Sequence, residues 1–156
     1  MSKPTSRRVF LQTAGSALPL VALVVSLGGC DSQSGMDNDD NPPPPPPGSG
    51  ITIEGNTVIL DLTGSEARKV ANPGGFLHID AADMLVVNVE GTIRAFSSIC
   101  THQGCEISSF QNNRFVCFCH GSQFGTDGRV IQGPATRALT EYSVQRDGNI
   151  VRITKG

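Results

Sequence analysis

The sequence has few aromatic residues and no tryptophan. Phe, Trp and Tyr together make up 5% of its 156 residues, and there is one tyrosine. Glycine, by contrast, is frequent, with 18 residues. This composition argues against a long helical bundle and favours one small β domain with many turns.

The sequence also lacks a long uninterrupted apolar run. The apolar stretch at residues 14–29 is shorter than the roughly 20 residues that a helix needs to cross a bilayer, and Pro19 interrupts it. It follows a positive segment that contains Arg7 and Arg8, which is the arrangement of an export signal. We therefore expect residues 1–29 to be an export signal that is cleaved, with an uncut signal that stays as a membrane anchor as the alternative.

Two short motifs specify this export prediction. The string S-R-R-V-F-L at residues 6–11 resembles a twin-arginine (Tat) signal, which belongs to proteins exported already folded, and an ordinary Sec signal is the alternative. The string L-G-G-C that ends at Cys30 resembles a bacterial lipobox, which predicts a lipidated Cys30. A lipid with more than one acyl chain would hold the protein on a membrane surface. The expected location is therefore the periplasmic or outer face of the cytoplasmic membrane.

An excess of basic residues is also missing. Without residues 1–29, 9 Lys and Arg remain against 14 Asp and Glu, which gives a net charge of about −5. Nucleic acid is therefore not an expected partner.

Residues 30–50 lack the apolar side chains that a folded segment needs. Outside its prolines, the stretch after Cys30 has Met36 as its one apolar residue, so it is expected to be a disordered linker. The six prolines at residues 42–47 predict a stiff polyproline II rod of roughly 19 Å. A spacer and a swinging arm are both compatible with this composition.

Short β-type runs alternate with turn residues from residue 51 onward, and residues 65–70 indicate one short helix. Glu90-Gly91 and Asp147-Gly148 predict hairpin turns, the second of type I′. We expect an all-β fold over residues 51–156, an antiparallel β sandwich with a loop-rich subdomain at about residues 94–135. The expected strands are 57–62, 76–79, 84–89, 92–96, 114–117, 129–131, 139–144 and 149–154.

Cysteine and histidine are scarce but concentrated. Four of the five cysteines and two of the three histidines fall in residues 100–105 (C-T-H-Q-G-C) and 117–122 (C-F-C-H-G-S). Such concentration is not a packing accident. One cysteine and one histidine from each box can hold a two-iron cluster, with both thiolates on one iron and both imidazoles on the other.

The two boxes resemble those of the Rieske family, C-T-H-x-G-C and C-P-C-H-G-S. The resemblance implies one 2Fe-2S cluster with Cys100 and Cys117 as thiolate ligands and His102 and His120 as imidazole ligands. Zinc is the chemical alternative, since two cysteines and two histidines also make a tetrahedral zinc set. The spacings C-x-H and C-x-C-H differ from the usual C-x-x-C zinc pattern, so a zinc-binding, non-redox module is the least favoured function.

The same resemblance implies a disulfide between Cys105 and Cys119 that joins the two ligand loops. With Cys30 lipidated, this pairing leaves no free thiol. A disulfide requires an oxidising compartment, which agrees with the predicted export.

The family pattern also indicates how the cluster is tuned. Family members carry a serine and a tyrosine after the second box, whose hydrogen bonds to sulfur raise the reduction potential. Ser122 matches the serine, whereas Phe124 replaces the tyrosine and predicts a lower potential. Phe118 replaces a proline. Gln103 replaces the leucine that usually covers the cluster near the quinone in quinol-oxidising members, which weakens the inference that quinol is a partner. Residues 133–135 resemble the proline loop that shields the cluster.

The implied function is an exported, membrane-tethered one-electron carrier, the iron-sulfur subunit or a free-standing relative of a quinol:cytochrome c oxidoreductase, with cytochrome b- and c-type partners. The alternative is the small Rieske subunit of another exported oxidoreductase, similar to arsenite oxidase. A Rieske oxygenase is disfavoured because its mononuclear iron needs two histidines and a carboxylate, and only His78 lies outside the boxes. His78 is far from both boxes in the sequence and is assigned no role.

Overall fold

The structure is a computed structural model, and it describes residues 42–156. The predicted export signal at residues 1–29, the lipobox with Cys30 and the linker up to residue 41 lie outside the described residues. No helix among residues 42–156 has the length and apolar character needed to cross a bilayer.

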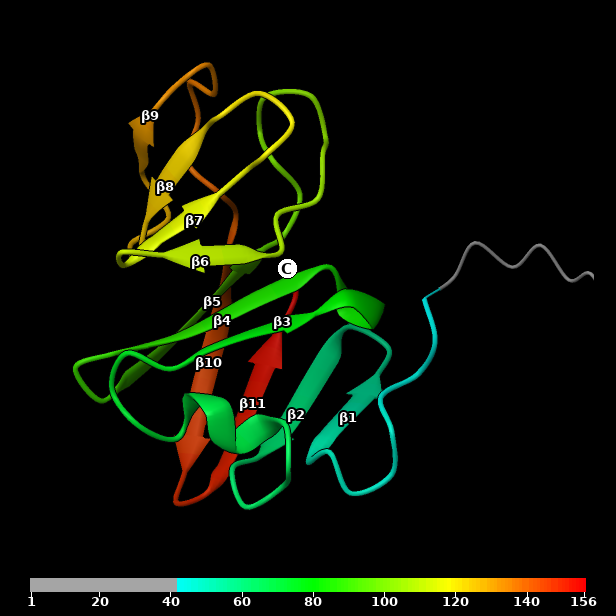
Figure 1. The fold of residues 1–156 in the computed structure, drawn as a ribbon. Helices are drawn as coiled ribbons and strands as arrows, with labels where there is room; N and C mark the ends of the chain where they lie inside the picture. Colours follow the sequence, from blue (N-terminus) through cyan, green and yellow to red (C-terminus); the bar gives the residue numbers. More distant parts are fainter. Residues whose placement is uncertain (1–41) are drawn as a thin grey trace, which may run out of the picture. The chain divides into compact units, whose positions relative to one another are not determined.

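The fold is all-β, as predicted, and consists of two antiparallel sheets (Figure 1). The larger sheet has seven strands in the order β1-β2-β11-β10-β5-β4-β3, and the smaller has four in the order β6-β7-β8-β9. The strands are β1 (Ile51–Glu54), β2 (Thr57–Asp61), β3 (Phe76–Ile79), β4 (Met84–Val89), β5 (Thr92–Ser97), β6 (Ser109–Gln111), β7 (Arg114–Val116), β8 (Gln123–Gly125), β9 (Val130–Gln132), β10 (Glu141–Asp147) and β11 (Ile150–Thr154). Two 3-10 helices, η1 (Ala67–Val70) and η2 (Asp80–Ala82), complete the fold.

Strand β4 separates two hydrophobic cores. Its alternate side chains point to opposite faces of the sheet. Met84 and Val86 belong to the core of the larger sheet, whereas Leu85 and Val87 belong to a second core shared with the smaller sheet. We call the region between β5 and β10, residues 98–140, the cap. The cap therefore packs on one face of β4 through an apolar interface.

One of the two predicted hairpin turns has the expected conformation, and the other differs. Glu90 and Gly91 join β4 to β5, and their φ values of 50° and 96° suit the predicted tight turn. The predicted type I′ turn at Asp147-Gly148 is wrong. Asp147 pairs with Ile150, so the loop residues are Gly148 and Asn149, and of these only Gly148 has a positive φ, 57°. Glycine at the first central position of a two-residue loop is characteristic of a type II′ turn.

Three short strands, β1, β6 and β8, are absent from the sequence prediction, and the predicted short helix is the 3-10 helix η1. The β6–β7 turn consists of Asn112 and Asn113, with φ values of 51° and 58°. Asparagine tolerates this left-handed conformation better than most residues, so the Asn-Asn pair was an available turn signal.

The chain joins the fold slightly before the predicted domain start at residue 51. Ser49 is buried, and its carbonyl accepts hydrogen bonds from the N–H groups of Glu66 and Ala67, both at 3.0 Å. The Gly50 carbonyl accepts a 2.7 Å bond from Asp61 N–H. Gly50 has a φ of 78°, and any side chain there would collide with the Asp61 carbonyl, so only glycine fits. The end of the proline-rich segment is thus tied to η1 and β2.

Candidate metal centre

The two boxes form loops with the same backbone closure. In the first, Gly104 N–H donates to Cys100 O at 2.9 Å; in the second, Gly121 N–H donates to Cys117 O at 3.0 Å. The two glycines have φ values of 75° and 79°, a region that disfavours residues with a side chain. The chain therefore builds one type of ligand loop twice.

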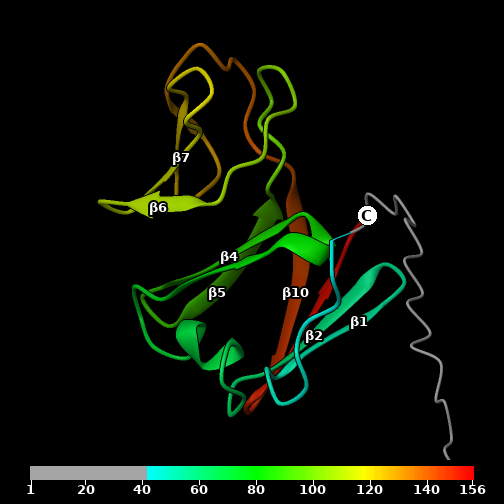
Figure 2. The same cartoon turned by 45° about the vertical axis from the view of Figure 1, so that its right-hand side comes forward.

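A second hydrogen bond is also equivalent in the two loops. Cys100 N–H donates to Cys105 O at 2.7 Å, and Cys117 N–H donates to Ser122 O at 2.9 Å, in each case five residues along the chain. Figures 1 and 2 show both loops at the end of the cap that lies away from the larger sheet, the first loop in light green and the second in yellow.

The structure brings the four predicted ligands together at this tip. Cys100 and Cys117 are buried, and they are the cysteines outside any disulfide within residues 42–156. His102 is half-buried and His120 is exposed. Their ring centroids are 4.8 Å apart, with the rings nearly perpendicular at 81°. The thiols thus lie inside and the imidazoles at the surface.

Cys105 and Cys119 form a disulfide with a Cα–Cα distance of 6.6 Å across 14 residues of sequence. That separation is within the range usual for disulfides. The sulfur of Cys117 lies within 4.8 Å of both disulfide sulfurs. The covalent link between the loops is therefore adjacent to one of the predicted ligands.

Two features of this site fit a bound iron cluster. His102 Nδ1 is buried and has no hydrogen-bond partner among the described residues. A buried polar atom is normally paired, and an iron ion on Nδ1 would supply the missing partner. Burial raises the pKa of the Cys100 thiol, opposed by a hydrogen bond from the backbone of His102; the nearby Cys117 side chain raises it further, and Ser122 lowers it. A metal is what stabilises buried thiolates of this kind.

A third loop closes over the site. The Ala135 N–H donates to Ser122 Oγ at 3.0 Å, and both residues are buried. Thr101 Oγ1 donates to the carbonyl of Arg137 at 2.6 Å. The segment predicted to shield the cluster, residues 133–135, is thus tied to the second box, and the residues after it are tied to the first.

The residues that depart from the family pattern have different surroundings. Phe124 is fully buried in the core of the cap, in the same hydrophobic cluster as Cys100 and Cys117. Gln103 is exposed, and Phe118 is 71% exposed beside the exposed Cys119 and His120.

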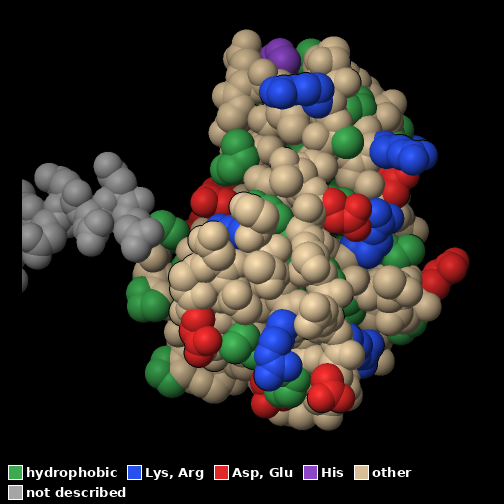
Figure 3. Space-filling view, turned by 180° about the vertical axis from the view of Figure 1, so that it is seen from behind, with side chains coloured by type: hydrophobic (Ala, Val, Ile, Leu, Met, Phe, Trp, Pro, Cys, Tyr) green, Lys and Arg blue, Asp and Glu red, His purple; other side chains and the backbone are tan. Residues whose placement is uncertain are grey.

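The surface at the tip of the cap carries polar side chains. Figure 3 shows a histidine there next to a basic side chain.

Aromatic side chains fix the cap to the larger sheet. Phe76 on β3 stacks on Phe110 at a centroid distance of 5.0 Å, and Phe96 on β5 contacts Phe115 at 5.7 Å. Sequence reasoning did not identify this cluster, because its members come from four separate strands. The cluster contains four of the chain's seven phenylalanines, and this share is the one feature of the sequence that could have indicated it.

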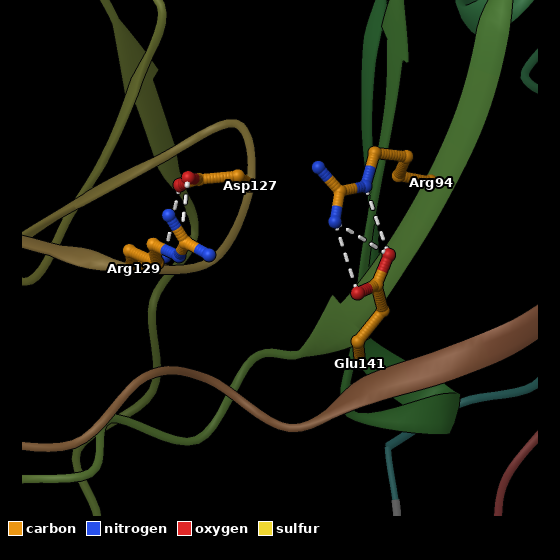
Figure 4. A network of polar contacts seen from close by, with 4 residues as sticks. All are labelled: Arg94, Asp127, Arg129 and Glu141. Carbon is orange, nitrogen blue, oxygen red and sulfur yellow. Dashed lines mark hydrogen bonds and ion pairs between the residues drawn. The ribbon is translucent and has the colours of Figure 1, made fainter.

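An ion pair joins the strands through which the chain enters and leaves the cap. Arg94 on β5 donates from Nε and Nη2 to the two carboxylate oxygens of Glu141 on β10, at 2.8 and 2.9 Å (Figure 4). These hydrogen bonds raise the pKa of Arg94. The same view shows Asp127 and Arg129, which lie in the β8–β9 turn, where Asp127 Oδ1 accepts a bond from Arg129 N–H at 3.0 Å.

The placement of His78 differs from the sequence interpretation. His78 is far from both boxes in the sequence, but its Nε2 lies 2.9 Å from Oε1 of Glu106, the residue after Cys105. The contact joins β3 to the first ligand loop, a long-range pairing that no local pattern indicates.

Comparison with known protein families identifies a match: the family model described as "Rieske [2Fe-2S] domain" matches residues 65–143, about half of the chain.

Curated relatives match over part of their length. The chain is 43% identical over 72 residues to the cytochrome b6-f complex iron-sulfur subunit of Prochlorococcus marinus (strain MIT 9515), an alignment that covers 44% of this chain and 40% of that protein. It is 34% identical over 114 residues to the chloroplastic cytochrome b6-f complex iron-sulfur subunit 1 of Nicotiana tabacum, covering 68% and 50%. The chain thus spans about half the length or less of these curated relatives. Among solved structures, the cyanobacterial plasma membrane Rieske protein PetC3 from Synechocystis PCC 6803 is 38% identical, with coverage of 46% and 76% and a TM-score of 0.43.

Proposed function

Because this chain belongs to the Rieske 2Fe-2S domain family, we propose that Cys100, Cys117, His102 and His120 hold its one 2Fe-2S cluster and that the protein carries single electrons. The observation that supports this ligand set best is the pairing of two imidazoles, 4.8 Å apart at the tip of the cap, with two buried cysteines outside any disulfide. The Cys105–Cys119 disulfide holds the two loops in register around them.

The ligand set determines how readily an electron enters. When bound, the cluster supplies one-electron chemistry at a potential of about −150 to +300 mV. Two neutral imidazoles replace two thiolates, so the ligand shell carries two fewer negative charges than a shell of four cysteines. An added electron is therefore repelled less. The buried cysteines keep water from the sulfur side, while exposed His120 gives an electron a route to a partner surface.

The histidines can also couple electron transfer to proton transfer. His102 has Nδ1 buried toward the site, so Nε2 is the nitrogen that can exchange a proton with a partner. A bound metal ion acidifies the opposite N–H of an imidazole ligand. A donor that loses a proton with its electron, such as a quinol, suits this arrangement, whereas exposed Gln103 does not provide the apolar cover expected near a quinone.

The proposed setting is an exported domain tethered to a membrane, as the iron-sulfur subunit or a free-standing relative of a quinol:cytochrome c oxidoreductase. The similarity to cytochrome b6-f iron-sulfur subunits supports this setting. The Tat-like string at residues 6–11 and the lipobox-like Cys30 support export and lipid attachment, and the proline-rich linker supports a tether.

Purification of the full chain from membranes in mild detergent, followed by mass spectrometry, tests this setting. Cytochrome b- and c-type proteins are expected to co-purify with the chain. Recovery with a molybdenum subunit instead would contradict the assignment and favour an arsenite-oxidase-like complex. A chain recovered without redox partners would identify the free-standing form.

A further inference from the structure

A second set of metal-ligating side chains lies at the junction between the larger sheet and the cap. His78 on β3, Asp80 at the start of η2 and Glu106 in the cap each offer one ligand atom, and these atoms all lie within 4.8 Å of one another. None of the three belongs to the proposed cluster site. The set combines one imidazole with two carboxylates.

The geometry at His78 is that of a ligand rather than of a hydrogen-bond donor. His78 Nε2 is 2.9 Å from Glu106 Oε1, yet it is buried and makes no hydrogen bond to any described residue. An N–H group needs its acceptor close to its own axis, so an oxygen this near without a hydrogen bond lies off that axis. Two ligands of one ion adopt this relation, because each directs its lone pair at the ion and not at the other.

We propose that His78, Asp80 and Glu106 bind one divalent transition-metal ion, for which Zn²⁺ is the matching probe. Imidazole and carboxylate oxygen are both common zinc ligands, and three protein ligands leave a fourth position for water. Two carboxylates balance the charge of the ion. Mg²⁺ prefers oxygen ligands and retains its waters, so the imidazole disfavours it.

The bound ion adds a link between two parts of the fold that are joined mainly by apolar packing and by backbone hydrogen bonds such as that from Ser98 N–H to the Asp83 carbonyl. Glu106 follows Cys105 of the disulfide, and its backbone pairs with Ile99 just before the first box. His78 lies on β3, an edge strand of the larger sheet, and Asp80 begins η2 directly after that strand. The ion therefore connects the first ligand loop to β3. Because the ion binds the folded state in preference to the unfolded chain, it stabilises the fold.

Calorimetric titration of the cluster-loaded, chelator-washed protein with Zn²⁺ tests the site. One Zn²⁺ per chain is expected, with the iron content and visible absorption unchanged, which shows that the ion has not replaced the cluster. His78→Gln and Glu106→Gln should each weaken binding at least tenfold. Glu54→Gln, which removes an exposed carboxylate on β1, is the matched control and should bind as the wild type does.

Thermal unfolding of the same proteins provides a second readout. Zn²⁺ should raise the unfolding temperature of the wild type and of Glu54→Gln, but not that of His78→Gln. Mg²⁺ at the same concentration should not raise the unfolding temperature of the wild type. If one variant loses its cluster, Asp80→Asn takes its place in both measurements. No binding at millimolar Zn²⁺, or equal binding by the wild type and the site variants, would overturn the proposal.

Discussion

At the scale of single residues, we expect the side chains next to the four proposed ligands to tune the reduction potential. Ser122 is buried, its Oγ accepts a hydrogen bond from Ala135 N–H, and its side chain lowers the pKa of Cys100. Its O–H is therefore the group that we expect to donate to a cysteine sulfur. Phe124 fills the neighbouring position with a ring that has no donor. Of the two hydroxyl donors that the family pattern leads us to expect, the chain thus has the serine and lacks the tyrosine.

Phe124→Tyr should raise the reduction potential. A new hydroxyl donor to sulfur favours the reduced, more negative cluster. A hydrogen bond contributes about 0.5–1.5 kcal/mol, which corresponds to roughly 20–60 mV for one electron. Protein-film voltammetry measures the shift, and an unchanged or lower midpoint would refute the assignment of Phe124 to the tyrosine position.

Ser122→Ala should lower the potential by a similar amount, about 20–60 mV, because it removes the hydroxyl that we expect to donate to sulfur. Ser98→Ala is the matched control. The Ser98 hydroxyl is equally buried, but it has no hydrogen-bond partner within residues 42–156. Equal shifts in the two variants would show that Ser122 acts through packing rather than through its hydroxyl.

At the scale of elements, the two ligand loops depend on the disulfide that joins them. The double variant Cys105→Ser/Cys119→Ser removes the link without leaving a free thiol. For a loop closed across 14 residues the expected loss is about 3 kcal/mol of unfolding free energy. Denaturant unfolding of the cluster-loaded domain measures it, and a loss below about 1 kcal/mol would mean that the cluster alone holds the loops together.

The ion pair between β5 and β10 should matter much less. Glu141→Gln should cost no more than about 1 kcal/mol, because the Glu141 side chain is 47% exposed and water screens the pair. The cost should fall further at high salt. Denaturant titrations at low and high salt check this, and a loss of several kcal/mol independent of salt would contradict it.

The sequence predicted those elements whose pattern is local. The strands 76–79 and 84–89 were predicted with the observed bounds, since β-branched and apolar runs there end at turn residues. β6 and β8 have three residues each, too few for an alternating pattern to be recognised. The boxes were found because their spacing is short and unusual. The contact of His78 with Glu106 depends on tertiary packing, which no local pattern encodes.

At the scale of the whole molecule, the cluster site is assembled from residues far apart in the chain. The first box, the second box and the loop at residues 133–135 meet only when the cap is folded. If the proposed cluster is inserted in the cytoplasm, the proposed export must carry a folded domain, and a Tat-type route meets that requirement.

Arg7→Lys/Arg8→Lys should block export while leaving the charge of the signal unchanged, because the Tat route requires the arginine pair. Cell fractionation followed by immunoblotting would then find the protein in the cytoplasm with its signal uncut. Lys3→Arg is the control and should be exported normally. Normal export of the double variant would indicate the Sec route.

The central claim is that two cysteines and two histidines hold one 2Fe-2S cluster. Metal and sulfide analysis of the wild type, combined with electron paramagnetic resonance after dithionite reduction, tests it most directly. We predict a coloured protein with two irons and two sulfides per chain. On reduction it should show a one-electron signal with nitrogen couplings from two histidines. A colourless protein with one zinc and no sulfide, or a signal without nitrogen couplings, would contradict the account.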